Sequence, residues 1–221
     1  MSIRGPNLFV EEPFQHSVIR GVLHVPDENQ SGDAIVLTHG AGSNCESPLL
    51  VKLARAFTAN GHLVVRYDLP FRIAGKPPGP ASGARDREGV VAAIEKARSI
   101  VRGRVIAGGH SYGGRQTSML AAERPGAADG LLLLSYPLHP PKKPEQKRTA
   151  HFPELRTPTL FVHGTSDPFG SIEELREAIG LIPAHTDLLP VEGAAHDLKR
   201  ASGLAADLLT RLYAVVCYPG T

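Results

Sequence analysis

A serine flanked by glycines stands where it could act as a nucleophile. Residues 109–113 read Gly-His-Ser-Tyr-Gly, a match to the pattern G-x-S-x-G with Ser111 at its centre. An apolar run over Val105–Gly108 precedes the motif and a helical pattern begins at Gly114, so the serine falls on a strand-to-helix turn. Such a turn exposes the hydroxyl above a sheet, and the helix N-terminus favours developing negative charge. Because the chain has 23 glycines, a match to this pattern alone is weak evidence. The position of the motif between a predicted strand and a predicted helix makes Ser111 the candidate nucleophile.

A serine hydroxyl needs a base to take its proton, and the base needs an acid to orient it. One known chain order of such a set is serine, acid, histidine. Asp167 follows the apolar run Thr159–Val162, whereas the alternative acid position, after the preceding run, holds Ser135. Asp167 is therefore the candidate acid, and the alternative interpretation is an ordinary loop aspartate that caps a helix.

The candidate base comes after the last predicted strand. Residues 192–196 read Glu-Gly-Ala-Ala-His, and their small side chains let the loop bring the imidazole of His196 over the sheet. His185 precedes the same strand and so lies at its opposite end. The order of the residues thus predicts a catalytic triad of Ser111, Asp167 and His196.

A second glycine-rich loop, His-Gly-Ala-Gly at residues 39–42, follows the apolar run Ala34–Leu37. Such a loop can turn a backbone N–H toward the substrate, and we expect the amides of Ala41 and Tyr112 to form an oxyanion hole. The alternative is a plain glycine turn without an oxyanion hole, in which His39 is only a packing residue. Further residues around these loops are expected to contact the substrate: His39, Gly42, Arg72, His110, Leu138 and Phe169.

The elements that position these residues alternate along the chain. Short apolar runs typical of strands buried on both faces cover residues 34–38, 63–67, 105–108, 131–135, 159–162 and 188–191. Helical patterns cover residues 48–60, 85–102, 114–124, 171–179 and 197–213. This alternation predicts an α/β fold with a doubly wound, mostly parallel sheet, and Val18–Val25 indicates an antiparallel N-terminal edge ribbon. Two irregular stretches, 69–83 and 137–158, connect strand ends, and the second is too broken to form a helical lid.

Composition narrows the class of protein. A chain of 221 residues with 42% hydrophobic residues predicts a single globular domain over 1–221. With a formal charge of +2, basic and acidic residues are too evenly balanced for nucleic-acid binding. The longest apolar run, Leu131–Leu134, is far too short for a membrane span.

Two cysteines and no apolar leader favour a cytoplasmic protein, and we expect a monomer or homodimer. Without a nucleotide-binding or metal-binding motif, we expect no cofactor and no metal.

Several short motifs extend beyond the candidate triad. They are Thr38–Gly42, Ser47–Leu50, Arg66–Asp68, Gly113–Arg115 and Ser135–His139. On these motifs and the candidate triad the chain resembles the α/β-hydrolase superfamily over almost its whole length. More narrowly it resembles a lidless dienelactone-hydrolase-like subgroup that includes the testis-expressed and NSL-complex hydrolase-like proteins.

The chain also departs from this subgroup. His110 and Tyr112 flank the serine where the subgroup has Arg or Lys and Met, so the shape of the pocket does not carry over. Dienelactone hydrolases use a cysteine nucleophile, so their substrate does not carry over to Ser111 either.

The residues and the resemblance together imply a serine hydrolase that cleaves a small, short-acyl carboxylic ester or thioester through an acyl-enzyme. Some relatives in the subgroup are thought to be scaffolds, so the alternative is a non-catalytic binding or scaffold protein of the same fold. The basic loop residues Arg72, Lys76, Lys142 and Lys143 could favour acidic esters, although loop cations are more often merely solvated.

Overall fold

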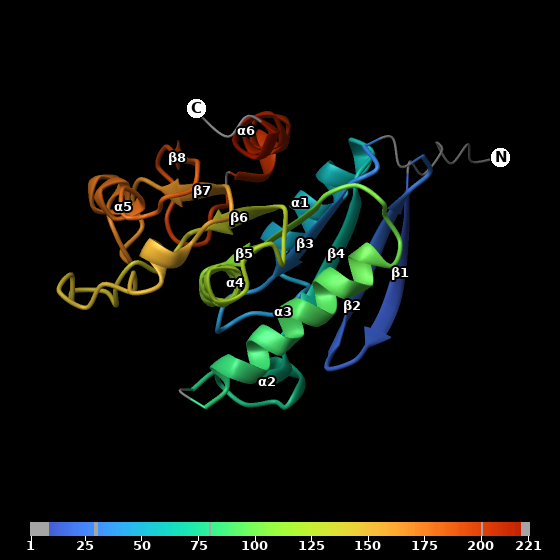
Figure 1. Ribbon diagram of the computed structural model, residues 1–221, viewed down its shortest axis with the longest axis horizontal. Coiled ribbons are helices and arrows are strands. Elements are labelled where there is room, and N and C mark those ends of the chain that lie inside the picture. The colour runs from blue at the N-terminus through green and yellow to red at the C-terminus, as the bar shows by residue number, and fades with distance from the viewer. Residues whose placement is uncertain (1–8, 29–30, 80, 200, 218–221) are drawn as a thin grey trace.

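A single eight-stranded sheet runs through the computed structural model, which describes residues 9–28, 31–79, 81–199 and 201–217 (Figure 1). The strand order is β1-β2-β4-β3-β5-β6-β7-β8. The strands are β1 Phe9–His16, β2 Ile19–Pro26, β3 Ala34–Thr38, β4 Leu63–Asp68, β5 Val105–His110, β6 Gly130–Leu134, β7 Thr159–Gly164 and β8 Thr186–Val191.

Strands β3 to β8 pair in parallel, whereas β2 pairs antiparallel with both β4 and β1. This arrangement confirms the predicted mostly parallel sheet with an antiparallel edge ribbon. The outer strand β1 has no counterpart in the prediction, because most of its side chains are exposed and Pro13 interrupts its pattern. Both features are typical of an edge strand.

Helices cover both faces of the sheet (Figure 1). Buried residues of α1 and α6 join one core cluster, and those of α3, α4 and α5 join the other. Successive residues of β3 alternate between the two clusters, with Val36 in one and Leu37 in the other. The helices are α1 Pro48–Ala59, α2 Pro70–Ile73, α3 Gly83–Arg98, α4 Tyr112–Glu123, α5 Ile172–Ile179 and α6 Ala205–Cys217, with 3-10 turns over Phe152–Glu154 and Ala201–Leu204.

Four of the five predicted helices lie close to their predicted bounds, and α5 begins with the capping box of Ser171 and Glu174. The fifth prediction is wrong at its start, because α6 begins at Ala205 and not at residue 197. Leu198 has a positive φ of 47° and a fully buried side chain, so this apolar residue packs in the core although its backbone is not helical. Within the described ranges, none of the helices combines the length and apolar character needed to cross a bilayer.

Candidate active site

Ser111 occupies a strained turn between β5 and α4. Its φ of 52° and ψ of −116° lie outside the regions that residues with side chains favour. A Cβ added at Gly109 would lie 2.8 Å from the carbonyl oxygen of Thr38, and one at Gly113 would lie 2.5 Å from that of His39. Both distances are too short for real atoms. The glycines of the motif therefore let this turn pack against the carboxyl end of β3.

His196 connects Ser111 to Asp167. The Ser111 hydroxyl oxygen lies 2.8 Å from Nε2 of His196, and Nδ1 of His196 lies 2.8 Å from Oδ2 and 3.0 Å from Oδ1 of Asp167. Because a carboxylate only accepts, Nδ1–H donates to Asp167, and Nε2 is left to accept the serine hydrogen. The three side chains form one hydrogen-bonded chain above the carboxyl ends of β5, β7 and β8.

Asp167 stays charged in a fully buried position. Burial alone would raise the pKa of this carboxyl. The hydrogen bond and charge of His196, the backbone N–H of Phe169 and the nearby His163 together outweigh burial and hold the pKa below its usual value. An ionised acid beside Nδ1 favours the tautomer in which Nε2 is free to accept a proton.

Phe169 packs directly on the imidazole of His196. The two ring centroids lie 4.2 Å apart at an interplanar angle of 32°. The backbone N–H of Phe169 also donates to Oδ1 of Asp167 over 2.9 Å. Phe169 thus contacts both the candidate acid and the candidate base, and it lines the pocket beside Ser111.

His110 supports the loop that carries His196. Its Nε2 lies 2.7 Å from the carbonyl oxygen of His196, and the two ring centroids lie 5.1 Å apart. Since a carbonyl only accepts, Nε2–H of His110 is the donor. Burial lowers the pKa of His110, which favours the neutral ring. The side chain lines a separate hollow with Leu49 and Leu198 and is absent from the lining of the pocket at Ser111. The structure thus shows His110 as a positioning contact, and its contact with a substrate stays a prediction.

We expect His110→Ala to lower kcat for ester hydrolysis by about tenfold or more, because a small displacement of a base is costly. KM should change less than about threefold, since His110 does not line the pocket. His110→Gln should recover most of kcat, because the Nε2 amide of glutamine can donate from a similar position. Steady-state kinetics of the three proteins measure this split. Equal losses in the Ala and Gln variants would contradict a role for the hydrogen bond.

The loop after β3 brings the Ala41 amide next to the nucleophile turn. A Cβ at Gly40 would lie 3.0 Å from Nδ1 of His110 and 3.4 Å from Cβ of Ser111, so this loop passes close to the serine. Tyr112 begins α4, where amides have no acceptor within the helix. In the described part of the chain, neither the Ala41 nor the Tyr112 amide bonds to a protein acceptor. The expectation that these two amides form an oxyanion hole stays a prediction.

Tyr112 is also held through its side chain. Its hydroxyl donates to Oδ2 of the fully buried Asp86 over 2.6 Å, and Oδ1 of Asp86 accepts from the backbone N–H of Phe71 over 3.0 Å. The ring packs edge-on against Phe71, with centroids 5.5 Å apart. This network ties the nucleophile turn to α3 and to α2.

Buried polar residues also fix the loop between β3 and α1, which carries Ala41 and is called the oxyanion loop below. Arg66 donates to the carbonyl oxygen of Cys45 over 2.6 Å, and Asp68 accepts from the Cys45 amide over 2.8 Å. His39 is fully buried, and its Nε2 lies 3.1 Å from the Leu69 amide. The prediction that His39 contacts a substrate is therefore wrong, because both faces of its ring are enclosed by protein.

Three other predicted substrate contacts lie outside the lining of the pocket beside Ser111, and for the two that are not fully buried, Arg72 and Gly42, contact with a substrate stays a prediction. Arg72 donates from Nε to the carbonyl oxygen of Ser43 over 2.6 Å, so it braces the oxyanion loop and does not line the pocket. Gly42 is exposed on the loop and is also outside the lining. Leu138 is fully buried under Gly170, which excludes contact with a substrate.

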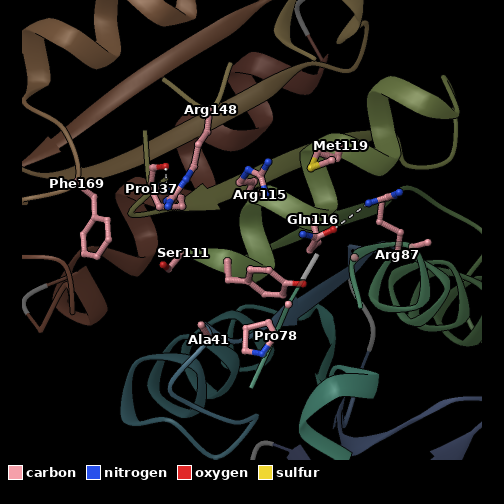
Figure 2. Close-up of a pocket in the computed structure, with 14 residues that line it drawn as sticks. Ala41, Pro78, Arg87, Ser111, Arg115, Gln116, Met119, Pro137, Arg148 and Phe169 are labelled. Carbon is pink, nitrogen blue, oxygen red and sulfur yellow. Dashed lines mark hydrogen bonds between the residues drawn. The ribbon is translucent and has the colours of Figure 1, made fainter. Parts of the chain in front are cut away.

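A pocket of about 720 Å³ opens beside Ser111 (Figure 2). Its walls come from the oxyanion loop, the segment before α3, the start of α3, the first turns of α4, the irregular stretch after β6 and the loop after β7. Residues that the sequence analysis did not single out as site residues include Pro78, Arg87, Arg115, Gln116, Met119, Pro137 and Arg148. Arg115 was accessible to prediction, since it lies one helical turn after Ser111. Arg148 had no such signal.

Among the described residues, no three His, Cys, Asp or Glu side chains group closely enough to hold a metal ion.

Comparison with known proteins agrees with this architecture. Residues 31–215 match the family described as alpha/beta hydrolase domain. The chain belongs to this family, and that membership supports hydrolase activity.

Solved structures with the same fold include the dienelactone hydrolase of Anabaena variabilis, at a TM-score of 0.73 and 19% identity over 93% of this chain and 97% of that one. An α/β serine hydrolase without a lid from Xanthomonas campestris has a TM-score of 0.73 and 15% identity over 94% and 96% of the two chains. Est1E from Butyrivibrio proteoclasticus has a TM-score of 0.72 and 14% identity over 94% and 99%.

Proposed function

We propose that this protein is a serine hydrolase that cleaves a carboxylic ester or thioester through an acyl-enzyme. The observation that carries the proposal is the continuous hydrogen-bonded chain from the Ser111 hydroxyl through His196 to Asp167, with 2.8 Å at each of its two links. It begins at a pocket wall and ends at a buried carboxylate.

In the acylation step, Oγ of Ser111 attacks the carbonyl carbon of the ester while its proton passes to Nε2 of His196. The carbonyl oxygen becomes an oxyanion and accepts hydrogen bonds from the Ala41 and Tyr112 amides. The bond to the leaving group then breaks, and His196 gives its proton to the departing alcohol or thiol. Asp167 stays ionised and stabilises the imidazolium that forms.

Deacylation repeats these roles with water. His196 takes a proton from a water molecule as its oxygen attacks the acyl carbon, and the same amides bind the second oxyanion. The bond to Oγ of Ser111 breaks, the proton returns to Oγ, and the carboxylic acid leaves. Ser111 is thereby regenerated.

We propose short acyl chains as the substrates. The stretch after β6 contains only the 3-10 turn Phe152–Glu154, so in the part of the chain that the structure describes no helical lid encloses a long acyl chain. Within the family, the motifs around Thr38, Arg66 and Arg115 favour a place near the lidless testis-expressed and NSL-complex hydrolase-like proteins.

Active-site labelling tests the proposal. A fluorophosphonate probe should modify the full-length protein at Ser111, as located by peptide mapping, because the reaction needs an activated and accessible hydroxyl. Ser111→Ala should abolish labelling, and Ser99→Ala, on the exposed end of α3, should not alter it. A folded protein that the probe leaves unmodified would favour the alternative, a binding or scaffold protein with this fold.

A further inference from the structure

Two arginines line the pocket beside Ser111. Arg115 lies on the first turn of α4, where its backbone N–H donates to the carbonyl oxygen of Ser111 over 3.0 Å. Residues four apart in a helix share one face, so Arg115 lies on the side of the nucleophile. Arg148 reaches the same pocket from the irregular stretch after β6, and Figure 2 shows the two side chains beside each other near Ser111.

The backbone of Arg148 is held in place. Its carbonyl oxygen accepts a hydrogen bond from the hydroxyl of the buried Tyr136 over 2.6 Å, and its N–H donates to the carbonyl oxygen of Leu138 over 2.7 Å. The guanidinium donates to the carbonyl oxygen of Pro137 over 3.2 Å. This side chain therefore reaches the pocket from a braced segment.

Neither arginine has an acidic partner within the described residues, whereas Arg87 on the same pocket pairs with Glu123 at 2.8 Å. Nε of Arg115 is buried and has no hydrogen-bond acceptor among the residues that the structure describes. Burial, followed by the positive charge of Arg115, lowers the pKa of Arg148. Two guanidinium groups thus lie at the same pocket wall and repel each other, and no carboxylate among the described residues pairs with either.

An anion between these groups would remove the repulsion and supply the missing acceptor. A guanidinium presents its N–H donors in a plane that matches the two oxygens of a carboxylate. We propose that Arg115 and Arg148 bind a carboxylate of the substrate, so that the preferred ester carries a second, acidic group. This inference rests on the proposed function, because it places the ester carbonyl at Ser111.

Matched substrates test the inference. One pair carries the charge on the acyl side: the monophenyl ester of adipic acid and the same ester with its free acid converted to an amide. The other pair carries it on the leaving group: 4-carboxyphenyl hexanoate and 4-carbamoylphenyl hexanoate. Within each pair the size is nearly constant and the charge changes. The measured quantity is the ratio of kcat/KM for acid over amide.

We expect this ratio to exceed ten in the wild-type protein for at least one pair, since charge-assisted hydrogen bonds contribute about ten- to a hundredfold. In Arg115→Gln and in Arg148→Gln the ratio should fall about tenfold. Arg102→Gln, at an exposed position outside the pocket, should keep the wild-type ratio.

Ratios near one for both pairs in the wild-type protein, or ratios that the two pocket variants leave unchanged, would overturn the inference. Hydrolysis of the amide substrates, with labelling of Ser111, would show in that case that the proposed function itself stands. If a pocket variant does not fold, the wild-type ratios and the other variant still decide the outcome. An absence of both hydrolysis and labelling would refute the proposed function and the inference together.

Discussion

Replacement of His196 by alanine is expected to lower kcat for ester hydrolysis by about 10⁵-fold or more. Without the imidazole, the Ser111 hydroxyl keeps its proton during attack and no group protonates the leaving group. Ser111→Ala should cost about as much, and the double variant should be no slower than either single variant, because the two residues act as one unit. Single-turnover rates with a short-chain phenyl ester measure all three losses.

His185 provides the control for this experiment. It lies before β8, and its Nδ1 is 3.2 Å from the carbonyl oxygen of Val215, so it faces α6 at the opposite end of the strand. His185→Gln should therefore keep kcat within about twofold of wild type. Retention of more than a tenth of the wild-type kcat in His196→Ala, or losses that multiply in the double variant, would contradict the proposed relay.

The contact among the three candidate residues was foreseeable because of a simple property of parallel sheets. Ser111, Asp167 and His196 each follow a strand at its carboxyl end, and parallel strands bring these ends to the same edge. Short apolar runs between helical patterns were enough to identify those strands. The fold class was predictable for the same reason, since strands buried on both faces typically show such runs and these alternate with helical patterns.

Other features depend on packing that no local pattern records. His39 has the residue type and the position of a substrate contact, yet its ring fills a buried space beside Leu69. Arg148 belongs to a loop without periodicity, and hydrogen bonds with Tyr136, Leu138 and Pro137 place it at the pocket. Leu198 lies in an apparently helical pattern, but its burial in a turn delays the start of α6.

Asp167→Asn is expected to lower kcat by about 10⁴-fold. The asparagine amide has nearly the same shape, so the loop after β7 is retained. Its NH₂ group can donate to Nδ1 of His196, which favours the tautomer with the hydrogen on Nε2, and that nitrogen then cannot accept the proton of Ser111. Steady-state kinetics with the same phenyl ester, normalised to folded protein by circular dichroism, measure the loss.

Asp197→Asn separates this effect from a general change of charge. Asp197 neighbours His196 in the chain, yet its carboxylate pairs with Lys199 at 2.9 Å and is half exposed, so kcat should change less than about fivefold. Comparable losses in the two variants would contradict a specific role for Asp167.

Acid unfolding gives an independent measure of the same buried carboxylate. The pKa of Asp167 is lower in the folded state, so its contribution to the free energy of unfolding is complete above the unfolded value of about 4 and is lost as pH falls through the folded value. Asparagine does not titrate, so Asp167→Asn should lose less stability than wild type between pH 5 and pH 3 in urea titrations. Equal losses would mean that His196 does not hold Asp167 in its charged form, and the orientation of the base would then need another cause.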